Sequence, residues 1–318
     1  MSEVVIQITD LQKTYDNGFE AVKGITLNIP RGIVYGFLGP NGAGKTTSLK
    51  MMVGLLKPSN GQVTINGHIP EQHSQEIKKL IGLIPQDLVL WEDLTVYENL
   101  HFVASMYRIP KNVANEKIDT LIKEIKLEEK RNSLAKHLSG GLKRRLNIIM
   151  GLVHDPQIVV CDEPTPGLDA QSRGLVWDFI MNLTRKQGKT VILTTHFMEE
   201  ADRLSDIISI IDNGKVLITD TGENLKNSIG EGDLVEIHLN NSAFLNSSLD
   251  LIKTMDGVED VFIHNDTLQV RCLNAPSKLA VIFNKLESQE GLEVRDLKIR
   301  KTTLEDVFLN LTGRDLRE

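Results

Sequence analysis

Two short segments of the chain combine glycine with hydroxyl and basic side chains in patterns that could hold phosphate. Residues 39–46 fit G-x-x-x-x-G-K-[ST], directly after an apolar run and before a helix-like run. Glycines let backbone N–H groups turn toward phosphate oxygens, Lys45 adds positive charge at the β/γ position, and the Thr46 hydroxyl can reach Mg²⁺. We expect a nucleotide to contact Gly39, Pro40, Asn41, Gly42, Ala43, Gly44, Lys45, Thr46 and Thr47.

The second segment is Ser139, Gly140 and Gly141, which stand just ahead of a basic, helix-like run. The open N–H groups and the positive dipole end of a helix attract anions, so this is a second docking point for phosphate. One nucleotide site needs only the first segment, and the sequence therefore raises the question of what the second one binds.

Two adjacent acids close a hydrophobic strand-like run at Asp162 and Glu163. Open α/β sheets expose their reactive groups at the carboxyl ends of strands. One acid can hold Mg²⁺ through water, and this is the role expected for Asp162. Its neighbour points the other way along the pleat and is free to orient or deprotonate an attacking water, so Glu163 is the candidate general base. Without the upstream phosphate loop, the pair reads equally well as a solvated turn.

In this order along the chain, the motifs resemble the nucleotide-binding subunit of an ATP-binding cassette (ABC) transporter. The resemblance implies ATP and Mg²⁺ as cofactors. It also implies that Tyr15 stacks on adenine and that Gln86 contacts Mg²⁺ and links the nucleotide to a helical insertion. His196 then touches the γ-phosphate, and Asp169 is the acid of a loop that lies across a dimer interface.

The same resemblance answers the question of the second segment. Residues 138–141, LSGG, are similar to the signature motif of the family. In that family the motif caps the γ-phosphate of the ATP held by the other subunit, so two phosphate sites in one chain imply two chains. Leu142 stands where glutamine is usual. This removes one amide and leaves the phosphate contacts expected of Ser139 and Gly141.

The pattern of strands and helices that must position these residues predicts an α/β fold. Apolar runs at 32–39, 157–163, 190–196 and 207–215 suit strands of a mostly parallel sheet, and residues 4–29 look like an antiparallel pair with a turn at 16–18. Residues 87–155 form the expected helical insertion, because apolar residues recur there at three- and four-residue intervals. We expect the side chains of Tyr97, Phe102, Met106 and Tyr107 to pack in its core.

A polar, glycine-containing stretch after Thr221 marks a boundary, so we expect a cassette domain at 1–222 and an accessory domain at 223–318. Between 234 and 300 the pattern runs strand, helix, strand, strand, helix, strand, which is the ferredoxin-like βαββαβ order. A last helix begins after a Thr cap and ends before Gly313. The tail, residues 301–318, resembles that of drug and antibiotic exporters.

Composition limits the classes of function. The 318 residues include 41% hydrophobic and 25% charged residues, as in a globular protein. A net charge of −7 opposes nucleic-acid binding, and residues 143–145 read as a solvated basic face with one or two contacts to the other subunit. Cys161 and Cys272 lie far apart in strand-like runs, which indicates reduced, buried thiols in a cytoplasm. The first residues lack a signal-peptide layout, and no run approaches a membrane span.

The sequence thus predicts an ATPase subunit that dimerises around two ATP molecules and drives small-molecule export through a separate membrane permease, without nucleic acid as a partner. We expect it on the inner face of the cell membrane. The alternative is a cassette ATPase that acts on ribosomes or DNA without transport; the single P-loop, the absence of a long coiled-coil insertion and the negative charge oppose it. A nucleotide-binding scaffold without turnover is disfavoured by Glu163 and His196.

Overall fold

The computed structural model describes residues 3–230, 232–273, 275–289 and 291–313. The chain divides into two compact units between Gly222 and Glu223, here called the N-terminal and C-terminal units. The end of the predicted exporter-like tail, residues 314–318, lies outside the described residues.

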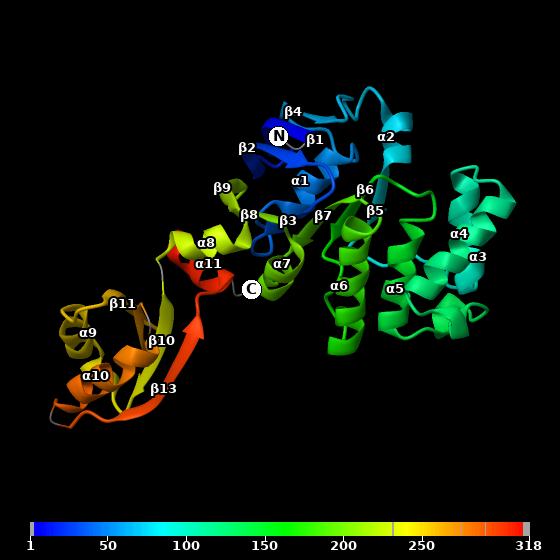
Figure 1. The fold of residues 1–318 in the computed structure, drawn as a ribbon. Coiled ribbons are helices and arrows are strands. Elements are labelled where there is room, and N and C mark those ends of the chain that lie inside the picture. The colour runs from blue at the N-terminus through cyan, green and yellow to red at the C-terminus, as the bar shows by residue number, and fades with distance from the viewer. Residues whose placement is uncertain (1–2, 231, 274, 290, 314–318) are drawn as a thin grey trace. The chain divides into compact units, whose positions relative to one another are not determined.

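The N-terminal unit is built on a six-stranded sheet with the order β5-β6-β7-β3-β8-β9 (Figure 1). Its first five strands are parallel, and β9 pairs antiparallel with β8. The strands span Val34–Leu38 (β3), Ile81–Ile84 (β5), Ile158–Asp162 (β6), Thr190–Thr195 (β7), Ile207–Asp212 (β8) and Lys215–Asp220 (β9). The predicted parallel sheet is confirmed.

Alternate residues of the central strands enter two separate cores, one on each side of the sheet. In β6, Val159 and Cys161 join one apolar cluster, whereas Ile158 and Val160 join the other. Successive side chains of a strand point to opposite faces, and a sheet covered on both faces therefore needs continuous apolar runs.

Cys161 and Cys272 are free and buried, as predicted, and burial raises the pKa of the Cys161 thiol to about 12.

A second, antiparallel sheet of order β2-β1-β4 contributes to the same unit and consists of Val4–Thr14 (β1), Glu20–Pro30 (β2) and Asn60–Ile65 (β4). The predicted turn joins β1 to β2, with Gly18 at φ +81°. The helices that cover the parallel sheet are Lys45–Met52 (α1), Ser74–Leu80 (α2), Ala170–Arg185 (α6) and Met198–Leu204 (α7).

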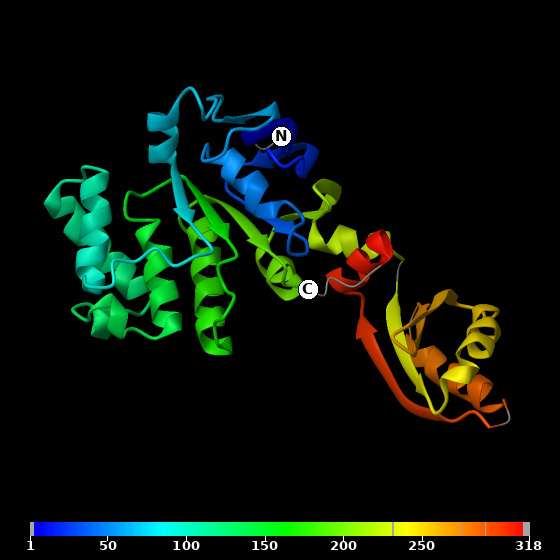
Figure 2. The same ribbon diagram turned by 180° about the vertical axis from the view of Figure 1, so that it is seen from behind.

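The remaining helices of this unit gather at one end of it, away from the antiparallel sheet, as Figures 1 and 2 both show. They are Val96–Met106 (α3), Lys111–Glu124 (α4) and Gly140–Met150 (α5), with short 3₁₀ turns at Glu128–Lys130 (η1) and Ala135–His137 (η2). Among the residues described, no helix has both the length and the apolar character required to cross a bilayer.

The expectation that the aromatic and Met side chains of α3 pack in the core is wrong for most of them. Phe102, Met106 and Tyr107 are exposed, while Tyr97 packs half-buried against the core. α3 turns a different stripe inward, formed by Val96, Asn99, Leu100 and Ala104. The apolar residues of this helix exceed one face, so its periodicity did not decide which face would be buried.

The C-terminal unit forms a four-stranded antiparallel sheet with the order β11-β12-β10-β13. Its elements follow the predicted βαββαβ sequence: Asp233–Leu239 (β10), Leu245–Lys253 (α9), Val258–His264 (β11), Thr267–Cys272 (β12), Ala275–Glu287 (α10) and Val294–Lys301 (β13), with a 3₁₀ turn at Ser242–Phe244 (η3). Gly222–Ser228 (α8) precedes them and Leu304–Thr312 (α11) follows. This split βαβ topology confirms the predicted ferredoxin-like fold.

Candidate active site

The loop between β3 and α1 presents open backbone N–H groups at the start of a helix. Gly44 is the N-cap of α1 with φ +100°, and a Cβ there would lie 2.5 Å from the carbonyl oxygen of Ala21. At Gly39 a Cβ would lie 2.1 Å from the carbonyl oxygen of Ile211. Only glycine fits both positions. No side chain caps α1 and its first turn holds no acid, so the helix start is free to receive an anion.

Lys45 is buried, although its side chain carries a charge. The ammonium donates to the carbonyl oxygens of Gly39 (2.8 Å) and Pro40 (3.1 Å), and it pairs with Glu163 Oε1 at 3.3 Å. Burial lowers the pKa of Lys45, and the Glu163 carboxylate partly opposes that shift. The loop thus holds a pre-positioned positive charge with little water around it.

Thr46, in the first turn of α1, meets Asp162 at the carboxyl end of β6. The Thr46 hydroxyl donates to Asp162 Oδ1 at 3.0 Å, and the Thr194 hydroxyl at the end of β7 donates to the same oxygen. Asp162 is 5% exposed. A hydroxyl and a carboxylate oxygen side by side are the ligand type that a hard divalent cation prefers.

Three other predicted side chains lie close to the Glu163 carboxylate. Its Oε2 lies 3.1 Å from His196 Nδ1 and 3.5 Å from Gln86 Nε2, while its Oε1 faces Lys45. Glu163 has φ +46°, a left-handed conformation that costs a non-glycine residue roughly 1 kcal/mol or more. These four side chains, from four separate segments, form one cluster beside the phosphate loop.

Tyr15 lies at the edge of the same loop. Its hydroxyl is 3.4 Å from the Thr47 hydroxyl, and 39% of the residue is exposed. Lys13 Nζ lies 5.6 Å from the centre of the ring. The Tyr15 hydroxyl therefore lies near the end of the phosphate loop, and its ring is not part of the apolar core.

The predicted signature residues form a helix start of their own. Ser139 is the N-cap of α5, and its Oγ accepts from the Leu142 N–H at 3.4 Å. Nothing lies within 4 Å of a Cβ built on Gly140, whereas one on Gly141 would come within 3.0 Å of Ser172 Oγ. Asp169 caps α6 by accepting from the Ser172 N–H (2.8 Å) and hydroxyl (3.0 Å), and these bonds lower its pKa.

Within the described part of one chain, no hydrogen bond or ion pair joins the signature residues or Asp169 to the residues of the phosphate loop. The structure thus brings Lys45, Thr46, Gln86, Asp162, Glu163 and His196 into one cluster, with Tyr15 and Thr47 beside it. It leaves Ser139, Gly140, Gly141 and Asp169 at separate helix starts.

The chain shares these motifs with known proteins. The family model described as ABC transporter matches residues 22–166. Over 317 residues the chain is 33% identical to the linearmycin resistance ATP-binding protein LnrL of Bacillus subtilis (strain 168), which covers 99% of this chain and 100% of that protein. The chain belongs to the ABC transporter family.

Further similarities agree with this assignment to the ABC transporters. The daunorubicin/doxorubicin resistance ATP-binding protein DrrA of Streptomyces peucetius is 36% identical over 312 residues, 97% of this chain and 92% of that one. The solved structure of cbiO1 from Clostridium perfringens, part of an ABC transporter complex, matches with a TM-score of 0.66 at 27% identity, covering 71% of this chain and 92% of that one. The predicted family, fold class and ATPase activity are confirmed.

A dimeric ATP-binding cassette solved in a post-hydrolysis state with ADP and Pi is also similar, with a TM-score of 0.62 at 28% identity. It covers 68% of this chain and 98% of that one. The length matched is close to that of the N-terminal unit, which holds every candidate site residue of this ABC transporter subunit.

One prediction about the basic residues of this ABC transporter subunit is wrong. Arg144 is not part of a solvated face: it is 5% exposed and donates to backbone carbonyls near Glu163. Lys143 pairs with Glu92 at 2.9 Å. The helical period does not separate Arg144 from its neighbours, because Lys143 and Arg145 also precede buried residues of α5 by one turn. Thr194 was also missed, because a strand-end threonine gives no signal of its own.

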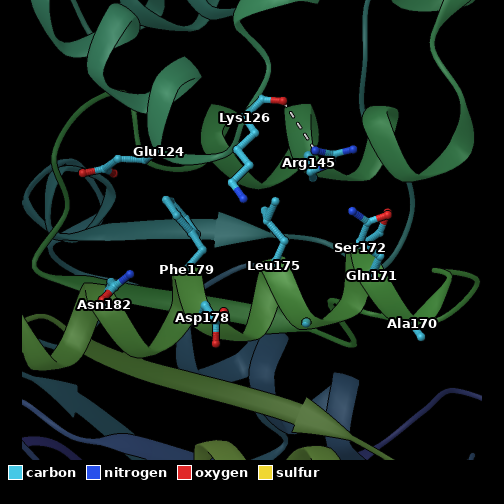
Figure 3. Close-up of a pocket in the computed structure, with 11 residues that line it drawn as sticks. Glu124, Lys126, Arg145, Ala170, Gln171, Ser172, Leu175, Asp178, Phe179 and Asn182 are labelled. Atoms are coloured by element: carbon cyan, nitrogen blue, oxygen red, sulfur yellow. Dashed lines mark hydrogen bonds between the residues drawn. The ribbon is translucent and has the colours of Figure 1, made fainter.

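Arg145 has a different environment, which Figure 3 shows. It lines a cleft of about 570 Å³ between α6 and the end of α4, and its guanidinium donates to the carbonyl oxygens of Ile125 (3.3 Å) and Lys126 (3.5 Å). Leu175 and Phe179 of α6 face into the cleft. Arg144 and Arg145, which are successive residues of α5, therefore donate hydrogen bonds to different segments of the chain.

Proposed function

We propose that two copies of this chain enclose two ATP molecules, each held between the phosphate loop of one copy and the signature segment of the other. The observation that carries this proposal is the cluster of Lys45, Gln86, Glu163 and His196 beside the loop. Within the described residues, the helix start at Ser139 makes no hydrogen bond or ion pair to the phosphate loop of its own chain, and this supports a second copy as its complement.

The phosphate loop binds the triphosphate through its backbone N–H groups and Lys45. Mg²⁺ fits the site, because Thr46 and Asp162 offer a hydroxyl and a carboxylate oxygen next to where the β- and γ-phosphates would lie. No group of three or more His, Cys, Asp or Glu side chains in the described ranges could hold a metal by itself, so phosphate oxygens and water would complete the ligand set. When bound, Mg²⁺ neutralises charge on the phosphate oxygens.

Glu163 is the general base for the attacking water, and Gln86 and His196 orient it. The ion pair with Lys45 occupies the carboxylate while no phosphate is present. Binding of the γ-phosphate draws the Lys45 ammonium toward it and leaves Glu163 to accept a proton from water. Tyr15 stacks on adenine with its exposed ring face.

The helical end of the N-terminal unit docks the permease. A groove of about 490 Å³ lies beside α3 and has Leu55, Val89, Trp91, Met106 and Tyr107 among its lining residues, all of them exposed. Asn99 holds the loop before α3 in place through bonds to Trp91 and Leu94. A contiguous exposed apolar surface of this kind is typical of a protein interface.

The transported molecule is a small compound that leaves the cell, and the chain lies on the inner face of the membrane. The relatives that support this direction are named for linearmycin and daunorubicin/doxorubicin resistance. Residues 223–318 act as an accessory domain, with residues 87–155 of the first domain, 1–222, as the insertion that transmits the ATP-driven change.

Glu163→Gln tests the proposal. The amide keeps the shape of the side chain but cannot accept a proton, so ATP hydrolysis should fall by about 10²-fold or more while ATP binding persists. Sedimentation in saturating MgATP should then show a dimer, and MgADP should leave a monomer. The variant should also co-purify with a permease from cell membranes.

Lys45→Ala is the control, because it removes the charge that grips phosphate and should abolish both hydrolysis and the ATP-dependent dimer. A Glu163→Gln protein that stays monomeric in MgATP with and without the permease would contradict the proposed sandwich. Wild-type rates in that variant would rule out Glu163 as the base.

A further inference from the structure

Arg144 lies in the second turn of α5, the helix that begins at the signature segment. Although a guanidinium is charged, 5% of the residue is exposed, and no ion pair among the described residues includes it. Removing a charge from water costs several kcal/mol unless hydrogen bonds replace the lost solvent. The environment of Arg144 must therefore supply those bonds.

The guanidinium receives them from backbone oxygens. Nε donates to one carbonyl at 2.7 Å, Nη1 to two at 2.7 and 2.9 Å, and Nη2 to two more. The five acceptors are the carbonyl oxygens of Pro164, Pro85, Gln86, Asp162 and Glu163. An arginine has five N–H donors in a rigid planar fork, so each donor of Arg144 has one acceptor.

These acceptors belong to two segments that carry the catalytic cluster. Pro85 and Gln86 follow β5, while residues 162–164 end β6 and turn away from the sheet. The turn passes through Glu163 at φ +46°, a strained conformation that persists only where its surroundings hold it. The Glu163 N–H is held by Thr194 on one side, and its carbonyl oxygen is held by Arg144 on the other.

We propose that Arg144 is a positioning residue for ATP hydrolysis. It fixes the backbones of Gln86 and Glu163 relative to each other, so that their side chains meet at the attacking water, and it joins both to the signature helix α5. Movement of α5 on ATP binding is thereby transmitted to the catalytic carboxylate. The inference rests on the roles proposed above for Gln86 and Glu163.

Arg144→Lys tests this role. Lysine keeps the charge but is slightly shorter and has its three donors on a single nitrogen, so it cannot hold both segments. We expect kcat for ATP hydrolysis to fall by about tenfold to 100-fold, with KM for ATP within about threefold of wild type, because the phosphate loop is untouched. Rates are expressed per bound nucleotide, so that partial loss of folded protein does not alter kcat.

Arg145→Lys is the matched control. The same substitution one residue further on affects the bond to Lys126 that Figure 3 shows and a second bond to Ile125, both just after α4, and kcat should stay within about twofold of wild type. If Arg144→Lys fails to fold, Arg144→Gln, which keeps two donors in a planar group, replaces it in the same comparison.

A double-mutant cycle separates positioning from general destabilisation. If Arg144 acts through Gln86, the combined variant Arg144→Lys with Gln86→Ala should lose at least about fivefold less kcat than the product of the two single losses. Arg145→Lys with Gln86→Ala should be multiplicative. Wild-type kcat in Arg144→Lys, or a multiplicative cycle, would overturn the inference. A wild-type chain without ATPase activity would instead overturn the function of the whole site.

Discussion

At the scale of single residues, the buried charges of the N-terminal unit are held by different kinds of partner. Lys45 has backbone carbonyls and one carboxylate, whereas Arg144 has carbonyls alone. A charge bound to carbonyls stays fixed in position, and a charge paired with a carboxylate can exchange that partner for a phosphate. This difference fits Lys45 to ligand binding and Arg144 to holding the loops.

Asp155, just before β6, shows what such partners contribute to stability. Burial alone would raise its pKa, but hydrogen bonds from Lys117 (2.8 Å) and Lys189 (2.9 Å) lower that pKa to about 2. A depressed carboxyl pKa stabilises the folded state above the unfolded value near 4, and the contribution is lost as the pH falls toward 2. Asp155 is therefore a stabilising group at neutral pH.

We expect Asp155→Asn to lower the free energy of unfolding at pH 7 by about 1 kcal/mol, a discounted figure because the side chain is 65% exposed. The difference from wild type should shrink between pH 4 and pH 2. Urea titrations across this range measure it. Asp178→Asn, at a carboxylate 75% exposed and 3.8 Å from Arg203, is the control and should change stability by less than about 0.5 kcal/mol. A constant difference at all pH values would contradict the assignment.

At the scale of elements, the two ends of α11 show how capping residues fix where a helix begins and ends. α11 begins after Thr303 and ends at Gly313, which has φ +68°, as the sequence predicted. Asp306 accepts from the Thr303 N–H and hydroxyl and also binds Arg300 through both carboxylate oxygens. Burial opposes ionisation of Asp306, but these bonds lower its pKa. One carboxylate thus joins β13 to the start of α11.

Asp306→Ala should destabilise the C-terminal unit by about 2 kcal/mol, since it removes a helix cap and takes from Arg300 one of its two carboxylate partners, leaving Glu236. Both tryptophans, Trp91 and Trp177, lie in the N-terminal unit. In urea titrations, far-UV circular dichroism should be lost at a lower urea concentration than in wild type, while the tryptophan fluorescence transition stays unchanged. This result would locate the effect in the C-terminal unit. Glu305→Ala, at the exposed neighbouring acid, should have little effect. Equal effects of the two variants would contradict the capping role.

At the scale of the whole molecule, the two units have separate apolar cores. The apolar clusters of the N-terminal unit share no residue with the cluster around β10, β12 and α10. Every residue of the candidate site lies on the N-terminal side of Gly222. A ligand of that site should therefore stabilise one unit selectively.

For Glu163→Gln, MgATP at about 100 times its Kd should stabilise the N-terminal unit by about 2.7 kcal/mol. The thermal transition seen by tryptophan fluorescence should move to higher temperature. A second transition, seen by circular dichroism alone, should stay in place. Calorimetry with and without MgATP measures both transitions. A single transition seen by both probes would show that the units unfold as one, and no shift of the first transition would argue against ATP binding at this site.

The sequence by itself determined the parts of this protein that depend on local pattern. Continuous apolar runs predicted the buried parallel strands, and the turn at Gly18 predicted the first hairpin. Glycine spacing predicted the phosphate loop, because backbone N–H groups can surround a phosphate only where side chains are absent. The cluster residues Lys45, Asp162 and Glu163 belong to such patterns.

Only the tertiary structure decided which residues meet across segments far apart in the chain. Arg144 looked like its neighbours in a basic run, and its five acceptors lie at the end of β6 and in the segments that follow β5 and β6. Thr194 became a partner of Asp162 because β6 and β7 are adjacent in the sheet. Phe102, Met106 and Tyr107 proved exposed because one helix had more apolar residues than the core could cover. Burial and partnership depend on packing between elements, and local periodicity does not encode that packing.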